Sequence, residues 1–120
     1  MIQGTVSADG VPTITLSIAG QEWPAIMDTG FNGDLELPEG LRDGLHARYV
    51  GRVTSALAGG QIIEEDAYLV EFPFDDQTVQ AEATFVSGSQ ILIGTHLLRA
   101  YCLQINFVGR TVQLERGKSS

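Results

Sequence analysis

The sequence has little cysteine and little histidine. Cys102 is the one cysteine among 120 residues, so no disulfide can form within the chain. His46 and His96 are the two histidines, and with Cys102 they show none of the spacings typical of metal sites. We therefore interpret His96 and Cys102 as packing or surface residues, and we expect no metal and no other cofactor.

Basic residues are scarce too. Seven Lys and Arg stand against fifteen Asp and Glu, which gives a net charge of −8. Affinity for nucleic acids comes largely from Lys and Arg, so we expect no nucleic-acid partner.

Long apolar runs are absent. No segment approaches the roughly 20 apolar residues that a membrane-spanning helix needs. The segment Met1–Gly4 lacks the basic and apolar regions that open a signal peptide. We therefore expect a cytoplasmic protein with no membrane partner.

The most frequent pattern is alternation of polar and apolar side chains. It is clear at residues 13–18, 79–85 and 102–107, and Val112 and Leu114 continue it. Such alternation is typical of strands with one buried face. Because glycine-containing turn signals separate the short runs, the pattern favours an all-β barrel or sandwich.

The expected organisation is a single domain over residues 1–115, followed by a disordered tail over residues 116–120. Two segments have helical features. Residues 38–45 have room for a turn or two, and Thr95–Ala100 predicts a short helix in the C-terminal half, with Thr95 as its N-cap.

An apolar segment, residues 23–27, runs directly into Asp28-Thr29-Gly30. Gly30 and Gly33 permit backbone conformations or close approaches that a side chain would block. We therefore expect a tight loop that presents the Asp28 carboxylate. An ordinary Asp-containing turn has the same composition, so the tripeptide alone does not decide its role.

Two later segments add context. Residues 54–63 form a candidate hairpin with Gly59 and Gly60 at its tip. Residues 90–98 read as a short apolar strand, then Gly94, then the predicted helix. With this order of segments, the chain resembles the retropepsin-like aspartic proteases. That family carries a strand ending in Asp-Thr-Gly or Asp-Ser-Gly, a glycine-tipped flap hairpin and a late apolar-apolar-Gly segment.

More narrowly, the chain resembles the small bacterial and archaeal proteins called clan AA aspartic proteases. The match lies in Met1-Ile2-Gln3-Gly4-Thr5-Val6 and in the run from Asp28 to Pro38. The resemblance covers the whole chain and implies an acid-protease closed barrel that forms a two-fold homodimer. Thr95 and His96 depart from the family, which usually has Arg and then Asn or Asp there, the Arg supporting the dimer.

Peptide hydrolysis of this type needs two carboxylates, one to activate a water and one to hydrogen-bond the carbonyl. The sequence contains a single Asp-Thr-Gly, so the second Asp28 must come from a second chain, as a two-fold axis permits. The function we infer is an aspartic endopeptidase that cleaves an extended peptide or protein substrate. Asp28, Thr29 and Gly30 form its catalytic centre.

The resemblance also assigns residues around this centre. It implies that the substrate is bound by Phe31 and by the flap residues Leu57, Ala58, Gly59, Gly60 and Ile62. It implies that the site is supported structurally by Asn32, Gly33, Leu92, Ile93 and Gly94. We expect apolar substrate pockets from Phe31, Leu57 and Ile62. The N-terminal strand and the strand ending at Leu114 are candidates for pairing between chains.

Two alternatives stay open. The chain could be a catalytically weak module with the same fold that binds peptides or dimerises, because a fold does not guarantee a function. It could also be a monomer that works with a regulated partner, because the interface Arg of the family is missing.

Overall fold

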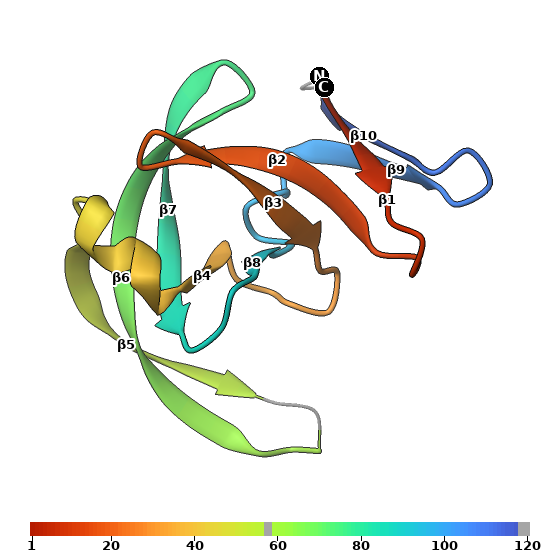
Figure 1. Cartoon of the computed structure of the whole chain (residues 1–120). Coiled ribbons are helices and arrows are strands. Elements are labelled where there is room, and N and C mark those ends of the chain that lie inside the picture. The colour runs from red at the N-terminus through yellow and green to blue at the C-terminus, as the bar shows by residue number, and fades with distance from the viewer. Residues whose placement is uncertain (57–58, 118–120) are drawn as a thin grey trace.

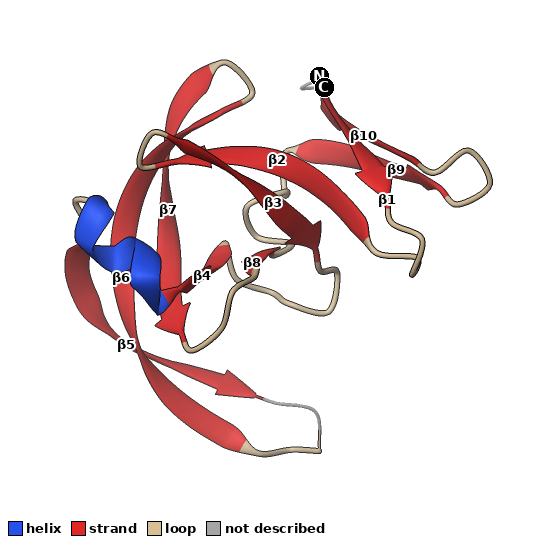
Figure 2. Cartoon of the chain, in the orientation of Figure 1, coloured by secondary structure: helices blue, strands red, loops and turns tan. Residues whose placement is uncertain are grey.

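Where the structure describes the chain, the protein is all-β apart from one short 3₁₀-helix. The structure, a computed structural model, describes residues 1–56 and 59–117. Its elements are β1 (Ile2–Val6), β2 (Pro12–Ile18), β3 (Gln21–Met27), β4 (Leu35–Pro38), the 3₁₀-helix η1 (Glu39–Gly44), β5 (Arg48–Ala56), β6 (Ile62–Phe74), β7 (Gln77–Val86), β8 (Ile91–Ile93), β9 (Tyr101–Asn106) and β10 (Thr111–Arg116). Figure 2 shows the strands in red and η1 in blue.

The ten strands form one sheet in the order β5-β6-β7-β4-β8-β3-β2-β1-β10-β9. Neighbouring strands are antiparallel, except that β3 pairs with β8 and β4 with β7 in parallel. The sheet bends back on itself, and β2 crosses over and contacts β6 (Figure 1). Among the described residues, the pairings begin at β5 and end at β9, so the expected closure into a barrel stays a prediction.

The core lies between the folded halves of the sheet and follows the alternation of the sequence. In β2, the side chains of Ile14, Leu16 and Ile18 are buried while Thr15 is exposed. Burying an aliphatic side chain of this size stabilises the fold by roughly 1.5–3 kcal/mol. The strand predicted over residues 79–85 is confirmed within β7. The alternation fails at Phe107, which is 62% exposed because β9 ends at Asn106 and a turn follows.

The predicted helix over Thr95–Ala100 is wrong. The segment is a series of turns, with Leu98 N–H donating to Thr95 O at 3.2 Å and Tyr101 N–H donating to Leu98 O at 2.9 Å. These bonds span three residues rather than the four of an α-helix. The six residues between Gly94 and β9 are too few for a stable α-helix. The segment Glu39–Gly44, in contrast, forms the helical turn expected there.

The terminal strands, which are candidates for pairing between chains, pair with each other within one chain, so their pairing between chains stays a prediction. β1 pairs with β10 on one side and with β2 on the other, and β10 also pairs with β9. Both edges of β10 are therefore used within one chain, while β2 pairs with β1 only at Thr5 and Val6. The expected tail also begins too early: Arg116 ends β10, and Gly117 N–H donates to Ala100 O at 2.7 Å. Residues 118–120 lie outside the described residues.

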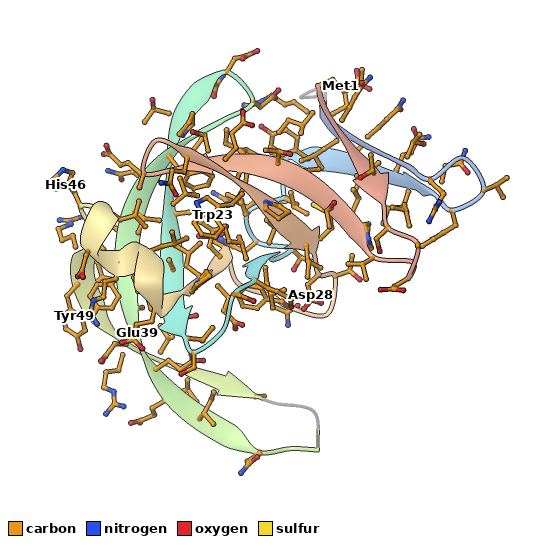
Figure 3. The ribbon with its side chains drawn as sticks, in the orientation of Figure 1. Met1, Trp23, Asp28, Glu39, His46 and Tyr49 are labelled. Atoms are coloured by element: carbon orange, nitrogen blue, oxygen red, sulfur yellow. The ribbon has the colours of Figure 1, made fainter. Side chains whose placement is uncertain are left out.

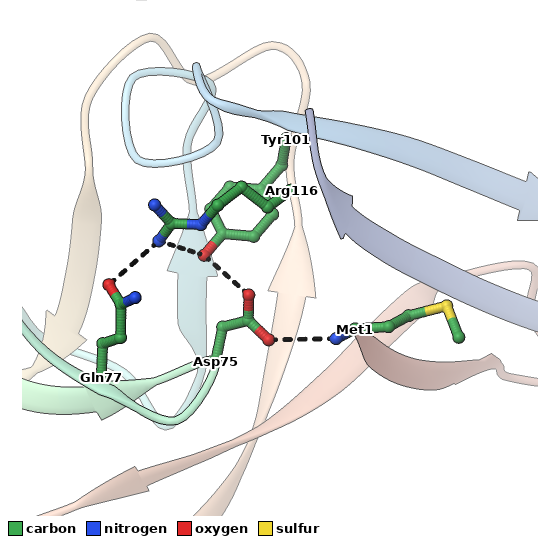
Figure 4. Close-up of polar contacts among 5 residues, drawn as sticks. All are labelled: Met1, Asp75, Gln77, Tyr101 and Arg116. Atoms are coloured by element: carbon green, nitrogen blue, oxygen red, sulfur yellow. Dashed lines mark hydrogen bonds and ion pairs between the residues drawn. The ribbon is translucent and has the colours of Figure 1, made fainter. Parts of the chain in front are cut away.

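A polar cluster fastens the β6–β7 turn to the strands near both chain ends (Figure 4). The Asp75 carboxylate accepts hydrogen bonds from the amino group of Met1 and from the Tyr101 hydroxyl, both at 3.2 Å. Arg116 donates to Tyr101 Oη at 3.3 Å and to Gln77 Oε1 at 3.1 Å. The hydrogen bond from the amino group lowers the pKa of the Asp75 carboxyl. This cluster lies outside the Asp28 loop and joins β6–β7 to β1, β9 and β10.

The tight turn between β2 and β3 offers a test of local strain. Ala19 has φ +52° and Gly20 has φ +79°, and Ala19 is exposed. The left-handed region costs an ordinary L-residue about 1 kcal/mol but costs glycine nothing. Ala19→Gly is therefore expected to raise the free energy of unfolding by about 0.5–1 kcal/mol in urea denaturation. Ala100→Gly, at an exposed site without positive φ, is the control and should not stabilise. Equal or lower stability of Ala19→Gly would show that the turn is unstrained.

Candidate active site

Asp28 lies at the end of β3, where the parallel pairing with β8 stops. Its N–H donates to Ile93 O at 2.9 Å, which continues the β3–β8 pairing by one residue. Its carboxylate Oδ1 accepts a hydrogen bond from Gly30 N–H at 2.9 Å, and its carbonyl accepts one from Phe31 N–H at 3.1 Å. Asp28 is half-buried, while Thr29 and Gly30 are exposed. The expected tight loop that presents a carboxylate is thus present (Figure 3).

The segment after β8 lies against this loop along its length. Thr95 N–H donates to Phe31 O at 2.8 Å, and His96 N–H donates to Gly33 O at 3.1 Å. A Cβ on Gly94 would overlap the Gly33 carbonyl oxygen, so the two glycines allow a close backbone approach. Gly33, Ile93 and Gly94, assigned to structural support, therefore do meet the Asp28 loop.

Asp34 ends the loop and was missed in the sequence. It is 8% exposed, and its Oδ2 accepts a hydrogen bond from Glu82 N–H in β7 at 2.9 Å. Its Oδ1 lies 2.6 Å from His96 Nδ1. His96, interpreted as a packing or surface residue, therefore contacts a buried carboxylate. The sequence gives only a weak signal that Asp34 belongs to the site: it follows Gly33 and directly precedes an apolar strand.

A cavity of about 350 Å³ separates the Asp28 loop from the β5–β6 hairpin. It is lined by Gly30, Phe31, Asn32, Gly33, Asp34, Leu35, Val53, Thr54, Ala56, Glu65, Glu82 and Thr84. Phe31, expected to form an apolar pocket, does line it, but the ionisable side chains in this lining are all acidic, which was not expected. In Figure 1 the hairpin projects on the side of the sheet where the loop after β3 lies.

The predicted flap residues are only partly described. β5 and β6 pair up to Ala56 and Ile62, which confirms a hairpin here. Gly59 and Gly60 have φ of +93° and +83° in its turn, a conformation that favours glycine. Ile62 is 68% exposed and does not line the cavity. Leu57 and Ala58 lie outside the described residues.

Glu36 is a further acidic group near the loop. It alternates in β4 with the buried Leu35 and Leu37, so it projects from the opposite face of the sheet, and it is only partly exposed. Burial, then the charge of Glu65 and then that of Asp28 raise the pKa of the Glu36 carboxyl. The sequence indicates its face of the strand but not its acidic neighbours, which come from β6 and from the end of β3.

The raised pKa of Glu36 makes a stability prediction. A carboxyl whose pKa is higher in the folded protein stabilises the fold below its unfolded value, 4.5, and loses that contribution as pH rises through the folded pKa. Glu36→Gln carries no charge at any pH. It is therefore expected to be more stable than the native chain at pH 7, by at most about 1 kcal/mol after solvent screening.

Urea denaturation at pH 7 and pH 4 checks this expectation. The difference between Glu36→Gln and the native chain should shrink at the lower pH. Glu39→Gln, at an exposed position in η1, is the matched control and should show neither effect. A Glu36→Gln variant that is less stable than the native chain at pH 7 would contradict the prediction.

Two further features concern ligands and membranes. Within residues 1–56 and 59–117, no three His, Cys, Asp or Glu side chains are grouped so that they could hold a metal ion. In the same part of the chain, no helix has the length and apolar character that crossing a membrane requires.

The sequence matches no family model and no curated protein. Solved structures do match. A retropepsin-like aspartic protease from Rickettsia conorii aligns with a TM-score of 0.64 and 17% identity, over 96% of this chain and 89% of that one. The simian foamy virus (mac) protease aligns with a TM-score of 0.56 and 20% identity, over 72% of this chain and 91% of that one.

A foamy viral protease-reverse transcriptase, solved in complex with an RNA/DNA hybrid, aligns with a TM-score of 0.59 and 16% identity. The alignment spans 88% of this chain but 13% of that one. At these identities the likeness concerns the fold alone. The chain therefore has a retropepsin-like fold, and the resemblance noted in the sequence is confirmed at that level.

Proposed function

We propose that the chain is an aspartic endopeptidase whose active centre is completed by a second copy of the chain. The observation that carries the proposal is the Asp28 carboxylate, held by Gly30 N–H at the end of β3 in a retropepsin-like fold. A ligand-sized cavity begins at Gly30 and Phe31, directly after it. The Rickettsia conorii neighbour is described as an aspartic protease and the simian foamy virus neighbour as a protease, which supports the same class of chemistry here.

In this proposal the second carboxylate comes from another chain. The sequence has one Asp-Thr-Gly. Asp34, the nearest aspartate along the chain, is buried and already bound to Glu82 N–H and His96. Thr29 and Gly30 are exposed beside Asp28, which leaves room for a partner's copy of the same loop.

In the proposed reaction, two Asp28 carboxyls share one proton, because two adjacent carboxylates do not both ionise easily. The ionised one takes a proton from a water, whose oxygen bonds to the carbonyl carbon of the substrate. The protonated one hydrogen-bonds the carbonyl oxygen. The C–N bond then breaks and the amine leaves with a proton from a carboxyl. The β5–β6 hairpin covers the extended peptide and limits access of other water.

The acidic lining of the cavity predicts a preference among peptides. Glu65 and Glu82 both line it, and Glu65 also raises the pKa of Glu36. A substrate with a Lys or Arg side chain in the cavity should be cleaved more efficiently than the same peptide with Glu there. Glu65→Gln is expected to reduce that preference about three- to fivefold in kcat/KM, the effect of one partly exposed ion pair.

Glu64→Gln is the matched control for this preference. Glu64 neighbours Glu65 on β6, does not line the cavity and pairs with Arg52 at 3.5 Å. Its removal should leave the preference unchanged. Equal cleavage of Lys and Glu peptides by the native chain would contradict the prediction.

The proposed function is tested by digesting a mixed peptide library between about pH 4 and pH 7 and identifying the products by mass spectrometry. We expect cleavage of internal peptide bonds, blocked by a statine-type inhibitor whose hydroxyl mimics the tetrahedral intermediate. A folded chain that binds peptides from the library without cleaving them would favour the alternative, a peptide-binding module. Cleavage that resists the inhibitor would contradict aspartic chemistry.

A further inference from the structure

We propose that Asp34 and His96 form a link between side chains that positions the Asp28 loop, an inference that rests on the function proposed above for its catalytic consequence. Both are positioning residues, since neither contacts the reacting atoms. The link itself belongs to the folded chain and can be measured without any cleavage.

Asp34 fastens the end of the Asp28 loop to two other parts of the sheet. Its buried carboxylate accepts the Glu82 N–H of β7 through Oδ2, at 2.9 Å. Its Oδ1 lies 2.6 Å from His96 Nδ1, and its carbonyl accepts Gly94 N–H at 3.0 Å. Each carboxylate oxygen therefore has a partner, as a buried acceptor requires.

A hydrogen bond at this distance needs one proton between the two groups. An ionised carboxylate only accepts hydrogen bonds, so beside an ionised Asp34 that proton lies on His96 Nδ1, which donates. The neutral Nδ1–H tautomer and the imidazolium both meet this condition. Arg99 Nη1 lies 3.4 Å from the same nitrogen. It also donates to His96 O at 2.6 Å, which stabilises the turn that carries the imidazole. The His96 side chain is 57% exposed, while that of Asp34 is 9% exposed.

The link is coupled to Asp28 by the backbone bonds between the same two segments. Ile93 O accepts Asp28 N–H at one end of the loop, and Thr95 N–H donates to Phe31 O in its middle. Among the described residues, the Asp34–His96 contact is the one hydrogen bond between side chains that joins these two segments. Without it, a buried carboxylate oxygen loses its donor and the loop must move to recover one. A small displacement of a reacting group is enough to slow catalysis severely.

His96→Ala removes the donor, and His96→Asn replaces it with an amide N–H near the position of Nδ1. With rates expressed per inhibitor-titrated site, we expect His96→Ala to lower kcat at least about tenfold with little change in KM. His96→Asn should recover most of the lost kcat. His46→Ala is the control, because His46 is exposed and does not line the cavity beside Asp28.

Hydrogen exchange gives a readout that does not depend on activity. The amides of Gly30 and Phe31 both donate to Asp28, so His96→Ala should speed their exchange about tenfold or more. The amide of Val112, in the paired strand β10, should exchange at the native rate. His96→Asn should restore the native pattern at Gly30 and Phe31.

The outcomes separate the two proposals. Absence of cleavage by the native chain would contradict the proposed function, while the exchange experiment would still test the link. Unchanged exchange at Gly30 and Phe31 in His96→Ala would overturn the link. So would equal acceleration at Val112, because the loss would then be global rather than local. A reduced kcat that His96→Asn does not restore would also overturn it.

Discussion

Asp28→Asn is expected to abolish peptide cleavage while leaving the chain folded. An amide cannot accept the proton of the attacking water, so kcat should fall by about 10³-fold or more. The Asn oxygen can still accept the Gly30 N–H bond that Asp28 Oδ1 accepts, so the loop should keep its shape. The measurement compares initial rates on one cleaved peptide for native and variant chains at equal concentration.

Asp43→Asn is the matched control for this variant. Asp43 is exposed in η1 and, like many turn aspartates, is followed by a glycine. Its replacement should leave cleavage unchanged. An Asp28→Asn chain that retains a tenth or more of the native rate would show that Asp28 is not the base. Binding of peptides by both chains with cleavage by neither would favour the peptide-binding module.

Gly94→Ala is expected to destabilise the fold strongly. Gly94 is buried, and an added Cβ would overlap the Gly33 carbonyl oxygen and lie 2.8 Å from Phe31 Cδ2. The nearest obstacle is backbone, which cannot rotate away as a side chain can. The loop and the turn after β8 must therefore separate, at a cost of about 3 kcal/mol or more in the free energy of unfolding.

Gly40→Ala serves as the control for Gly94→Ala. Gly40 lies in η1, where an added Cβ meets no atom within 4 Å, so its replacement should change stability by less than about 1 kcal/mol. Urea denaturation of both variants is the measurement. A Gly94→Ala chain with the native urea midpoint would contradict the close approach of Gly33 and Gly94.

The strands could be predicted because their alternation is local. In β2 and β7, each buried side chain is two residues from the next, so the sequence alone gives the inward face. The Thr95–Ala100 segment misled because its N-cap and apolar residues suit a helix. It forms a series of turns instead, because it is short and because its backbone is hydrogen-bonded to Phe31 and Gly33, which are distant in the sequence.

In the candidate site, too, local features could be predicted from the sequence and contacts between distant residues could not. Asp28 and its glycines are contiguous, so the tight loop could be predicted from sequence. The Asp34–His96 contact joins residues 62 positions apart, and no local pattern signals it. The raised pKa of Glu36 likewise depends on burial and on the charge of Glu65 in another strand. The pairing of β1 with β10 within the chain also depends on the order of the whole sheet.

Mixing native and Asp28→Asn chains tests most directly whether two chains share one active centre. At fixed total concentration and after exchange of subunits, an equal mixture leaves about one quarter of the dimers with two Asp28 carboxylates. We therefore predict that the mixture retains about a quarter of the activity of the native chain alone. Retention of about half, the value for chains that each act independently, would contradict a shared centre.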